Sequence, residues 1–253
     1  MQSLIQRAWA RLREQGMRAF VASAWRFLLD IPRRRRYATM LKLSTPEDRF
    51  AAIYGNNLWN SGESKSGYGS EMAATEALRD VLPRLVDAYN IQSVLDAGCG
   101  DFNWMRAVIP ALPVSYTGMD IVPSVIDENS RHYGSETVTF LAGNICEVPL
   151  PAADLVIARD CLFHLSYADI DRFLLNLAQT DYRFLLTTNH LPFPGEEIVN
   201  RDIETGDFRL LDLYSAPFGI PRDAAVERLA DHQLDQPREM LLLEKNVVPT
   251  RLG

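Results

Sequence analysis

The segment Ser93–Trp104 constrains this chain more than any other stretch of its sequence. It reads Ser-Val-Leu-Asp-Ala-Gly-Cys-Gly-Asp-Phe-Asn-Trp, so that an apolar run beginning at Ile91 ends at Asp96 and is followed by Gly98 and Gly100. This order predicts a buried strand, a glycine turn and the start of a helix. In open α/β sheets this junction binds a nucleotide-like ligand, and glycine lets the backbone approach the ligand closely because it has no Cβ atom.

Strands and helices alternate along the rest of the chain. This alternation predicts an α/β fold with a doubly wound, mostly parallel, seven-stranded sheet. The apolar runs are nearly continuous, as in strands covered on both faces. We expect strands at 91–96, 114–120, 137–141, 154–158, 182–188, 208–213 and 240–244. The strand at 240–244 is expected to be antiparallel, after a crossing from about Glu227–His232. We expect helices at 46–54, 70–88, 123–133 and 168–179, the second of them capped by Ser70.

The first 42 residues differ in charge from the rest of the chain. They contain ten Lys/Arg and two Asp/Glu, a net charge of +8, whereas the remainder carries −15, which gives the formal net charge of −7. Residues 2–29 have the spacing of an amphipathic helix, and the arginines throughout it argue against a membrane-spanning segment. The expected organisation is a basic helical arm at 1–45 and a main domain at 46–253. The acidic main domain argues against nucleic acid as a general partner.

The basic arm is compatible with several placements. Residues 1–36 combine Trp, Phe and Arg as do helices that lie on anionic membrane surfaces. The same pattern fits a helix packed on the main domain or on a second subunit, and an Arg-rich transit peptide is a further alternative. The sequence lacks the continuous apolar stretch of a secretory signal.

The cysteines and histidines bear on location and on metal binding. The three cysteines form no CxxC pair and lie in apolar runs, so we expect reduced thiols and a cytoplasmic protein, peripheral on the inner face of the membrane if the arm binds lipid. The four histidines lack metal-ligand spacing, so no metal site is expected.

A carboxylate at the end of the second expected strand narrows the ligand to a nucleoside. Asp120 follows Gly98 by 22 residues, a position from which it can accept hydrogen bonds from both ribose hydroxyls. The dinucleotide pattern G-x-G-x-x-G is incomplete, because Asn103 stands at the third glycine. Asp96 and Asp101, which flank the glycines, would repel a pyrophosphate but suit a ligand with a sulfonium and an α-amino group. S-adenosylmethionine is such a ligand.

Four segments in order resemble the motifs of class I S-adenosylmethionine-dependent methyltransferases. These segments are Val94–Gly100 (motif I), Tyr116–Ile121 (the second motif), Leu141–Ile145 (the adenine-lining segment) and Asp154–Asp160 (motif IV). Asn144 departs from the Asp of many members, although its side-chain oxygen can still accept a hydrogen bond from the adenine amino group. The similarity covers about residues 66–245.

A narrower resemblance is to a group of small bacterial methyltransferases. It is carried by Glu63–Ser70, with Trp59 before it, and by Gly98–Trp104. Members of this group are often found beside polysaccharide-biosynthesis functions.

The resemblance implies a cofactor-binding role for one set of residues: Ser66, Gly67, Asp96, Gly98, Cys99, Gly100, Asp120, Ile121, Asn144, Ile145 and Asp160. In this set, Asp96 and the glycine loop hold the methionine part and Asp120 holds the ribose. Ile121 packs on the adenine, and Asn144 with Ile145 completes that pocket. The loop that contains Ser66 and Gly67 closes over the methionine carboxylate or over the acceptor.

Two residues after the fourth expected strand are candidates for the chemistry. Transfer from a sulfonium is an in-line displacement, so the protein must position the acceptor and, for a hydroxyl, supply a base. His164 is the candidate base because its unperturbed pKa is near neutrality, and Asp160, four residues earlier, is expected near the sulfonium. The alternative for His164 is a histidine that only packs or caps.

The expected function is S-adenosylmethionine-dependent methyl transfer to an oxygen of a glycan or lipid-linked saccharide. The alternatives are a small-molecule N- or O-methyltransferase, and a non-catalytic, membrane-attached binding module of the same fold.

Overall fold

The computed structural model describes residue 32, residues 35–231 and residues 236–253. The chain divides into two compact units, Met1–Lys42 and Leu43–Gly253. In the first unit, residues 35–40 are helical, and the helix predicted over 2–29 lies outside the described residues. None of the described helices has the length and apolar character needed to cross a membrane. The sheet, its helices and the cavity all belong to the second unit.

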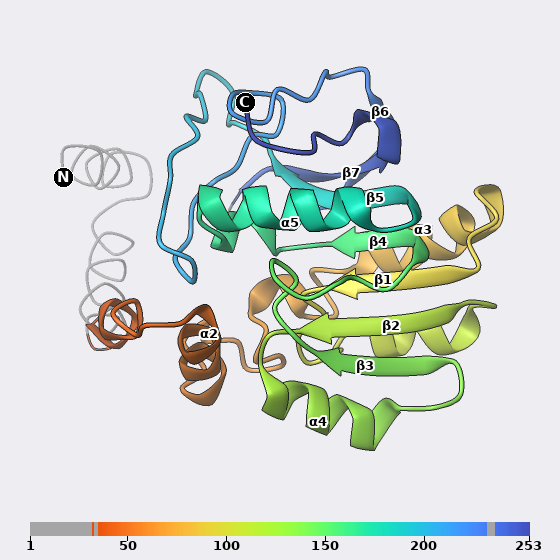
Figure 1. Ribbon diagram of the computed structural model, residues 1–253, viewed down its shortest axis with the longest axis horizontal. Helices are drawn as coiled ribbons and strands as arrows, with labels where there is room; N and C mark the ends of the chain where they lie inside the picture. Colours follow the sequence, from red (N-terminus) through yellow and green to blue (C-terminus); the bar gives the residue numbers. More distant parts are fainter. Residues whose placement is uncertain (1–31, 33–34, 232–235) are drawn as a thin grey trace, which may run out of the picture. The chain divides into compact units, whose positions relative to one another are not determined.

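A seven-stranded sheet forms the centre of the second unit (Figure 1). Its strands are β1 (Ser93–Ala97), β2 (Ser115–Asp120), β3 (Val138–Ala142), β4 (Ala153–Ala158), β5 (Tyr182–His190), β6 (Ala225–Ala230) and β7 (Arg238–Glu244). The order is β3-β2-β1-β4-β5-β7-β6, in which β1 to β5 are parallel and β7 runs antiparallel to both of its neighbours. The predicted doubly wound, mostly parallel seven-stranded fold is confirmed.

Four α-helices accompany this sheet in the second unit: α2 (Pro46–Gly55), α3 (Glu76–Ala88), α4 (Pro123–Tyr133) and α5 (Tyr167–Gln179). Side-chain caps and prolines near the first residues explain where three of these helices begin. The Thr45 side chain accepts a hydrogen bond from the Asp48 N–H at the start of α2, and Ser166 does the same for Asp169 at the start of α5. Proline occupies the first turn of α2 and of α4, where its missing N–H has no partner to lose.

The sheet separates two apolar cores. Figure 1 shows α5 in front of the sheet and α3 behind it. Leu95 of β1 and Val156 of β4 pack in the core that contains α5, whereas Val94 and Leu155 pack in the core that contains α3. Because successive side chains of a strand point to opposite faces, both faces must be apolar, and this explains the nearly continuous apolar runs.

The sixth strand does not lie where the sequence predicted it. Residues 208–213 are not a strand; instead the Leu211 carbonyl accepts the His190 N–H (2.9 Å) and the Leu213 N–H donates to the Asn189 side chain (2.7 Å). The strand is β6, in the stretch predicted to be a crossing. Leu229 is the one buried residue of β6 in the described chain. An edge strand of this kind needs little apolar surface, so its sequence signal is weak.

Ser70 does not cap a helix, contrary to the prediction. It ends a 3₁₀ turn at Tyr68–Ser70, and α3 begins only at Glu76. The intervening residues are held by the preceding loop, because the Met72 N–H donates to Glu63 Oε1 (2.8 Å) and the Ser61 hydroxyl donates to the Glu71 carboxylate (2.6 Å). These tertiary hydrogen bonds replace the helical ones.

Candidate active site

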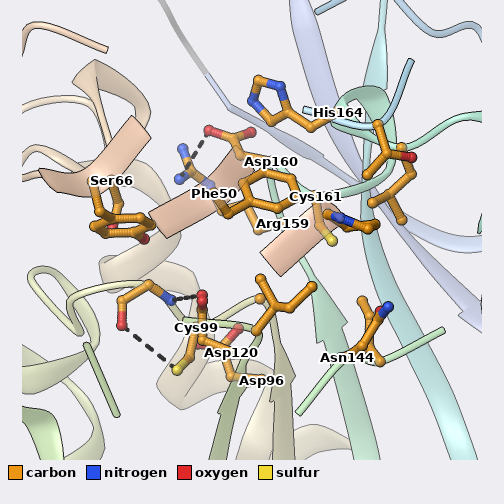
Figure 2. A pocket seen from close by; sticks show the side chains of 18 of the residues that line it. Phe50, Ser66, Asp96, Cys99, Asp120, Asn144, Arg159, Asp160, Cys161 and His164 are labelled. Atoms are coloured by element: carbon orange, nitrogen blue, oxygen red, sulfur yellow. Dashed lines mark hydrogen bonds and ion pairs between the residues drawn. The ribbon is translucent and has the colours of Figure 1, made fainter. Parts of the chain in front are cut away.

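A cavity opens at the carboxyl ends of β1, β2 and β4, and α2 and the loop after it contribute part of its wall (Figure 2). Nearly all the predicted site residues line it: Ser66, Asp96, Gly98, Cys99, Gly100, Asp120, Ile121, Asn144, Ile145, Asp160 and His164. Gly67 is the exception, because it packs on Trp59; a Cβ atom at Gly67 would lie 3.1 Å from Trp59 Cβ. The fold therefore gathers these predicted residues from five separate segments around one space.

The glycine loop has the close packing that its sequence predicted. Gly98 and Gly100 have φ angles of +91° and +58°, a region that disfavours other residues. A Cβ atom at Gly100 would lie 2.2 Å from Ser66 Oγ and 2.8 Å from the Tyr54 hydroxyl oxygen. The Gly100 N–H donates to the Asp120 carboxylate (3.0 Å), so the loop also orients the ribose-binding candidate.

Two buried carboxylates face this loop from β1 and β2. Burial raises the pKa of Asp96 to about 7, although the hydrogen bond from the Tyr116 hydroxyl (2.8 Å) partly opposes this. Burial likewise raises the pKa of Asp120 to about 6, opposed by the N–H groups of Val122 and Gly100. Desolvation disfavours the charged form of each carboxylate. A cationic or hydroxyl-bearing ligand would restore the interactions that ionisation needs.

Asp101 does not belong to the cavity wall, which corrects its predicted part in ligand choice. Its carboxylate accepts hydrogen bonds from the hydroxyls of Ser64 and Ser66 (2.9 Å each) and from the Lys65 N–H (2.8 Å). Its own N–H donates to Ser66 Oγ (3.0 Å). Asp101 therefore fastens the loop at 64–66 onto the glycine loop, and the acidic character of the cavity comes from other carboxylates.

Asn144 and Ile145, which follow β3, form the candidate adenine wall of the cavity. The Asn144 side-chain oxygen already accepts the Cys146 N–H (3.0 Å). Gly143 precedes it, and its N–H donates to the Asp120 backbone carbonyl (2.9 Å). One lone pair of the Asn144 oxygen and its amide N–H groups remain for a ligand.

His164 has a defined tautomer. Its Nδ1 lies 2.8 Å from the Asp207 carbonyl oxygen, which can only accept a hydrogen bond, so Nδ1 carries the proton and Nε2 carries a lone pair. Burial lowers the pKa of His164, which keeps the ring neutral near pH 7. The Trp59 ring lies beside it, with centroids 5.3 Å apart. A neutral imidazole with a free Nε2 has the form of a general base.

Asp160 is a fixed anion at the end of β4. It has a φ of +54°, and it accepts a hydrogen bond from Arg238 (2.8 Å) and forms an ion pair with Arg159 (3.4 Å). Burial opposes its ionisation, but the two arginines outweigh burial and lower the pKa of Asp160. Figure 2 shows Asp160 and His164 on the side of the cavity opposite Asp96 and Asp120.

No site role was predicted from the sequence for these residues of the cavity wall: Pro46, Phe50, Tyr54 and Arg159. Phe50 and Tyr54 belong to α2, which precedes the recognised motifs, and only their apolar spacing on that helix marked them. Arg159 lies within a recognised motif, but its charge alone gave no role.

Comparison with known proteins bears out the fold and the enzyme class. Residues 94–180 match the family model described as a methyltransferase domain. A search of curated proteins gave no match.

Solved structures of methyltransferases share the fold. Magnesium protoporphyrin IX methyltransferase from Synechocystis PCC 6803, with S-adenosylmethionine bound, superposes with a TM-score of 0.56 at 14% identity, over 80% of this chain and 98% of that one. Human N-acetylserotonin methyltransferase, also with the cofactor, gives 0.50 at 17% identity, over 77% of this chain and 58% of that one. The methyltransferase domain of a bacterial Hen1 superposes with a TM-score of 0.51 at 13% identity, over 67% of this chain and 97% of that one.

At these identities the likeness to solved structures shows the fold. Together with the domain match, it confirms the prediction of a methyltransferase with a Rossmann-like fold. The predicted cofactor, S-adenosylmethionine, agrees with both findings.

Proposed function

We propose that this protein transfers a methyl group from S-adenosylmethionine to a hydroxyl oxygen. The observation that carries the proposal is the single cavity that holds the glycine loop, two buried carboxylates and the unprotonated Nε2 of His164. The domain match supports the reaction class.

The chain's own residues fit the parts of this cofactor. Asp96 suits the ammonium group, and Asp120 suits the two ribose hydroxyls. Ile121, Asn144 and Ile145 form the wall for the adenine. When bound, the cofactor supplies a methyl group already activated by a sulfonium. The protein must therefore position the acceptor in line and take up its proton.

A hydroxyl acceptor fits the base in the cavity. A hydroxyl must lose its proton as it attacks, and His164 Nε2 is the basic atom that takes it up. Asp160, held by two arginines, stabilises the imidazolium that forms. The acceptor class that we propose is a glycan or lipid-linked saccharide. The Phe50 and Trp59 rings line the cavity with their centroids 6.4 Å apart, and Trp59 lies beside His164. Such aromatic faces suit a neutral, ring-shaped molecule.

We further propose that the basic arm at 1–36 brings the enzyme to an anionic membrane surface. Its net positive charge beside an acidic main domain supports this placement. A lipid-linked acceptor would be presented at such a surface.

Two measurements test the proposed reaction. Calorimetry with S-adenosylhomocysteine, the demethylated product, should show binding to the wild type and to His164→Ala alike. Methyl transfer to a panel of cell-envelope glycans and lipids should fall by about a hundredfold in His164→Ala, because the base is lost. His132→Ala, at an exposed histidine of α4, is the matched control and should retain full turnover.

Three outcomes contradict the proposal. Absence of binding to S-adenosylhomocysteine overturns the methyltransferase assignment. Unchanged turnover in His164→Ala removes this residue from the mechanism. A methylated amine product, with no methylated hydroxyl, assigns the enzyme to nitrogen acceptors instead.

A further inference from the structure

A buried arginine extends from the end of β4 to the loop over the cavity. Arg159 lines the cavity, yet its side chain is only 3% exposed. Its Nη1 donates to the Gly69 carbonyl (2.7 Å) in that loop, and its guanidinium lies 5.6 Å from the centroid of the Trp104 ring. Figure 2 shows the guanidinium between Ser66 and Asp160.

Arg159 belongs to a balanced group of buried charges. It pairs with Asp231 (3.1 Å) and Asp160 (3.4 Å), and Arg238 pairs with the same two carboxylates (2.8 Å each). The two arginines differ in one respect: Arg159 lines the cavity, whereas Arg238 does not. A structural ion network needs both residues, but only one of them is in a position to touch a ligand.

Arg159 and its neighbour Ser70 have hydrogen-bonding capacity left at the cavity. The buried Nε–H of Arg159 has no hydrogen-bond partner among the described residues. The Ser70 hydroxyl lines the cavity, next in the chain to Gly69, and makes no hydrogen bond to any residue in the described chain. A buried donor without an acceptor is costly, so the Arg159 Nε–H, at the wall of the cavity, indicates an acceptor supplied by a ligand. The Ser70 hydroxyl can donate to the same acceptor.

A negative and a positive side chain therefore line the same cavity, Asp96 from β1 and Arg159 from the residue after β4. The charge of each favours the ionised form of the other. A free amino acid group carries the complementary pair, an ammonium and a carboxylate. Arginine is the side chain best matched to a carboxylate, because its planar fork presents two parallel N–H groups.

We infer that Arg159, assisted by Ser70, binds the α-carboxylate of the cofactor's methionine part, opposite the ammonium at Asp96. The inference rests on the proposed function, since it assigns a residue to the same cofactor. It makes Arg159 a ligand-binding residue in addition to a member of the buried ion network.

Three ligands separate this role from a structural one. S-adenosylhomocysteine has both amino acid charges, its decarboxylated analogue 5′-S-(3-aminopropyl)-5′-thioadenosine keeps only the ammonium, and 5′-methylthioadenosine has neither. Calorimetry on the full-length wild type should show that removal of the carboxylate weakens binding by about tenfold or more. In Arg159→Met, S-adenosylhomocysteine and its decarboxylated analogue should bind with about the same affinity.

The matched control is Arg238→Met, which breaks the same ion network away from the cavity. It should leave the preference for the carboxylate-bearing ligand intact, even if all three affinities fall together. Ser70→Ala leaves the network untouched and should lower the preference by about fivefold. Should Arg159→Met fail to fold, Arg159→Lys replaces it, with a preference several-fold below wild type because the fork is lost.

The outcomes are distinguishable. If the wild type binds none of the three ligands, the proposed function fails and the inference with it. If the wild type binds S-adenosylhomocysteine but the Arg159 variants keep the full preference for the carboxylate, the inference alone is overturned. Loss of preference in Arg238→Met to the same degree as in the Arg159 variants would also overturn it.

Discussion

The protonation state of Asp96 changes near neutral pH because of its surroundings. It is buried on β1, its carboxylate accepts the Tyr116 hydroxyl, and burial raises its pKa to about 7. A cationic ligand binds the ionised form, so ligand binding and proton release are linked. The Asp120 pKa of about 6 gives a second titration in the same direction.

We expect affinity for S-adenosylhomocysteine to rise between pH 5.5 and pH 8. The sign follows because both pKa values are raised in the ligand-free protein, so protonation at low pH removes the charges that the ligand needs. Tyr116→Phe removes the hydrogen bond that favours the ionised form of Asp96, so it should move the upper midpoint to higher pH. Calorimetry across this pH range measures both effects.

Asp96→Asn and 5′-methylthioadenosine are the controls for that titration. The variant cannot ionise at position 96, and the ligand has no ammonium, so each should remove the step near pH 7 and leave the step near pH 6. A step near pH 7 that persists in Asp96→Asn would assign the titration to another group.

At the scale of elements, the loop between α2 and α3 is built by residues far from it in sequence. Asp101 binds Ser64, Lys65 and Ser66. The Tyr54 hydroxyl of α2 lies 2.8 Å from Ser66 Oγ, and Arg159 holds the Gly69 carbonyl. The loop is therefore fixed from the glycine turn, from α2 and from β4 at once, which gives the cavity a preformed wall.

Asp101→Ala should loosen this wall without touching the predicted chemistry. It removes the acceptor of three hydrogen bonds, so we expect KM for S-adenosylmethionine to rise by about tenfold while kcat changes little. Hydrogen exchange of the amides at 64–70 should accelerate in the same variant. Asp127→Asn, at an exposed position of α4, is the control. An unchanged KM would show that the loop does not contribute to cofactor binding.

At the scale of the whole molecule, the charge of the chain is divided between its two parts. The first 42 residues carry +8 and the rest −15. Attraction of a basic segment to an anionic surface amounts to about 1 kcal/mol per Lys or Arg near that surface. This is the physical basis of the proposed membrane placement.

The full chain should sediment with anionic liposomes but not with neutral ones, and this binding should weaken at high salt. Removal of residues 1–36 should abolish it while calorimetric binding of S-adenosylhomocysteine persists. Replacement of Arg33–Arg36 by glutamine keeps the length of the arm and should give an intermediate loss. Equal sedimentation with both kinds of liposome would contradict the proposal.

The class of fold and the nucleoside-binding edge of the sheet could be predicted from the sequence. β1, β2, β4 and β5 are buried on both faces, so their apolar runs are strong local signals, and the order of alternating elements leaves few topologies. Gly98 and Gly100 adopt positive φ angles that favour glycine, and Asp120 follows at the end of β2. Each of these features depends on residues that are neighbours along the chain, so it can be recognised in the sequence.

Which side chains line the cavity and which stabilise the surrounding structure became clear from the folded chain. Asp96 and Asp101 flank the same glycines, yet one lines the cavity and the other fastens a loop. Arg159 donates hydrogen bonds to Asp231 and Gly69, which are 72 and 90 residues away in the sequence. Contacts at such separations arise from packing and leave no local pattern. The weakly buried β6 went unpredicted for the complementary reason, since an edge strand needs few of the apolar residues that mark a strand.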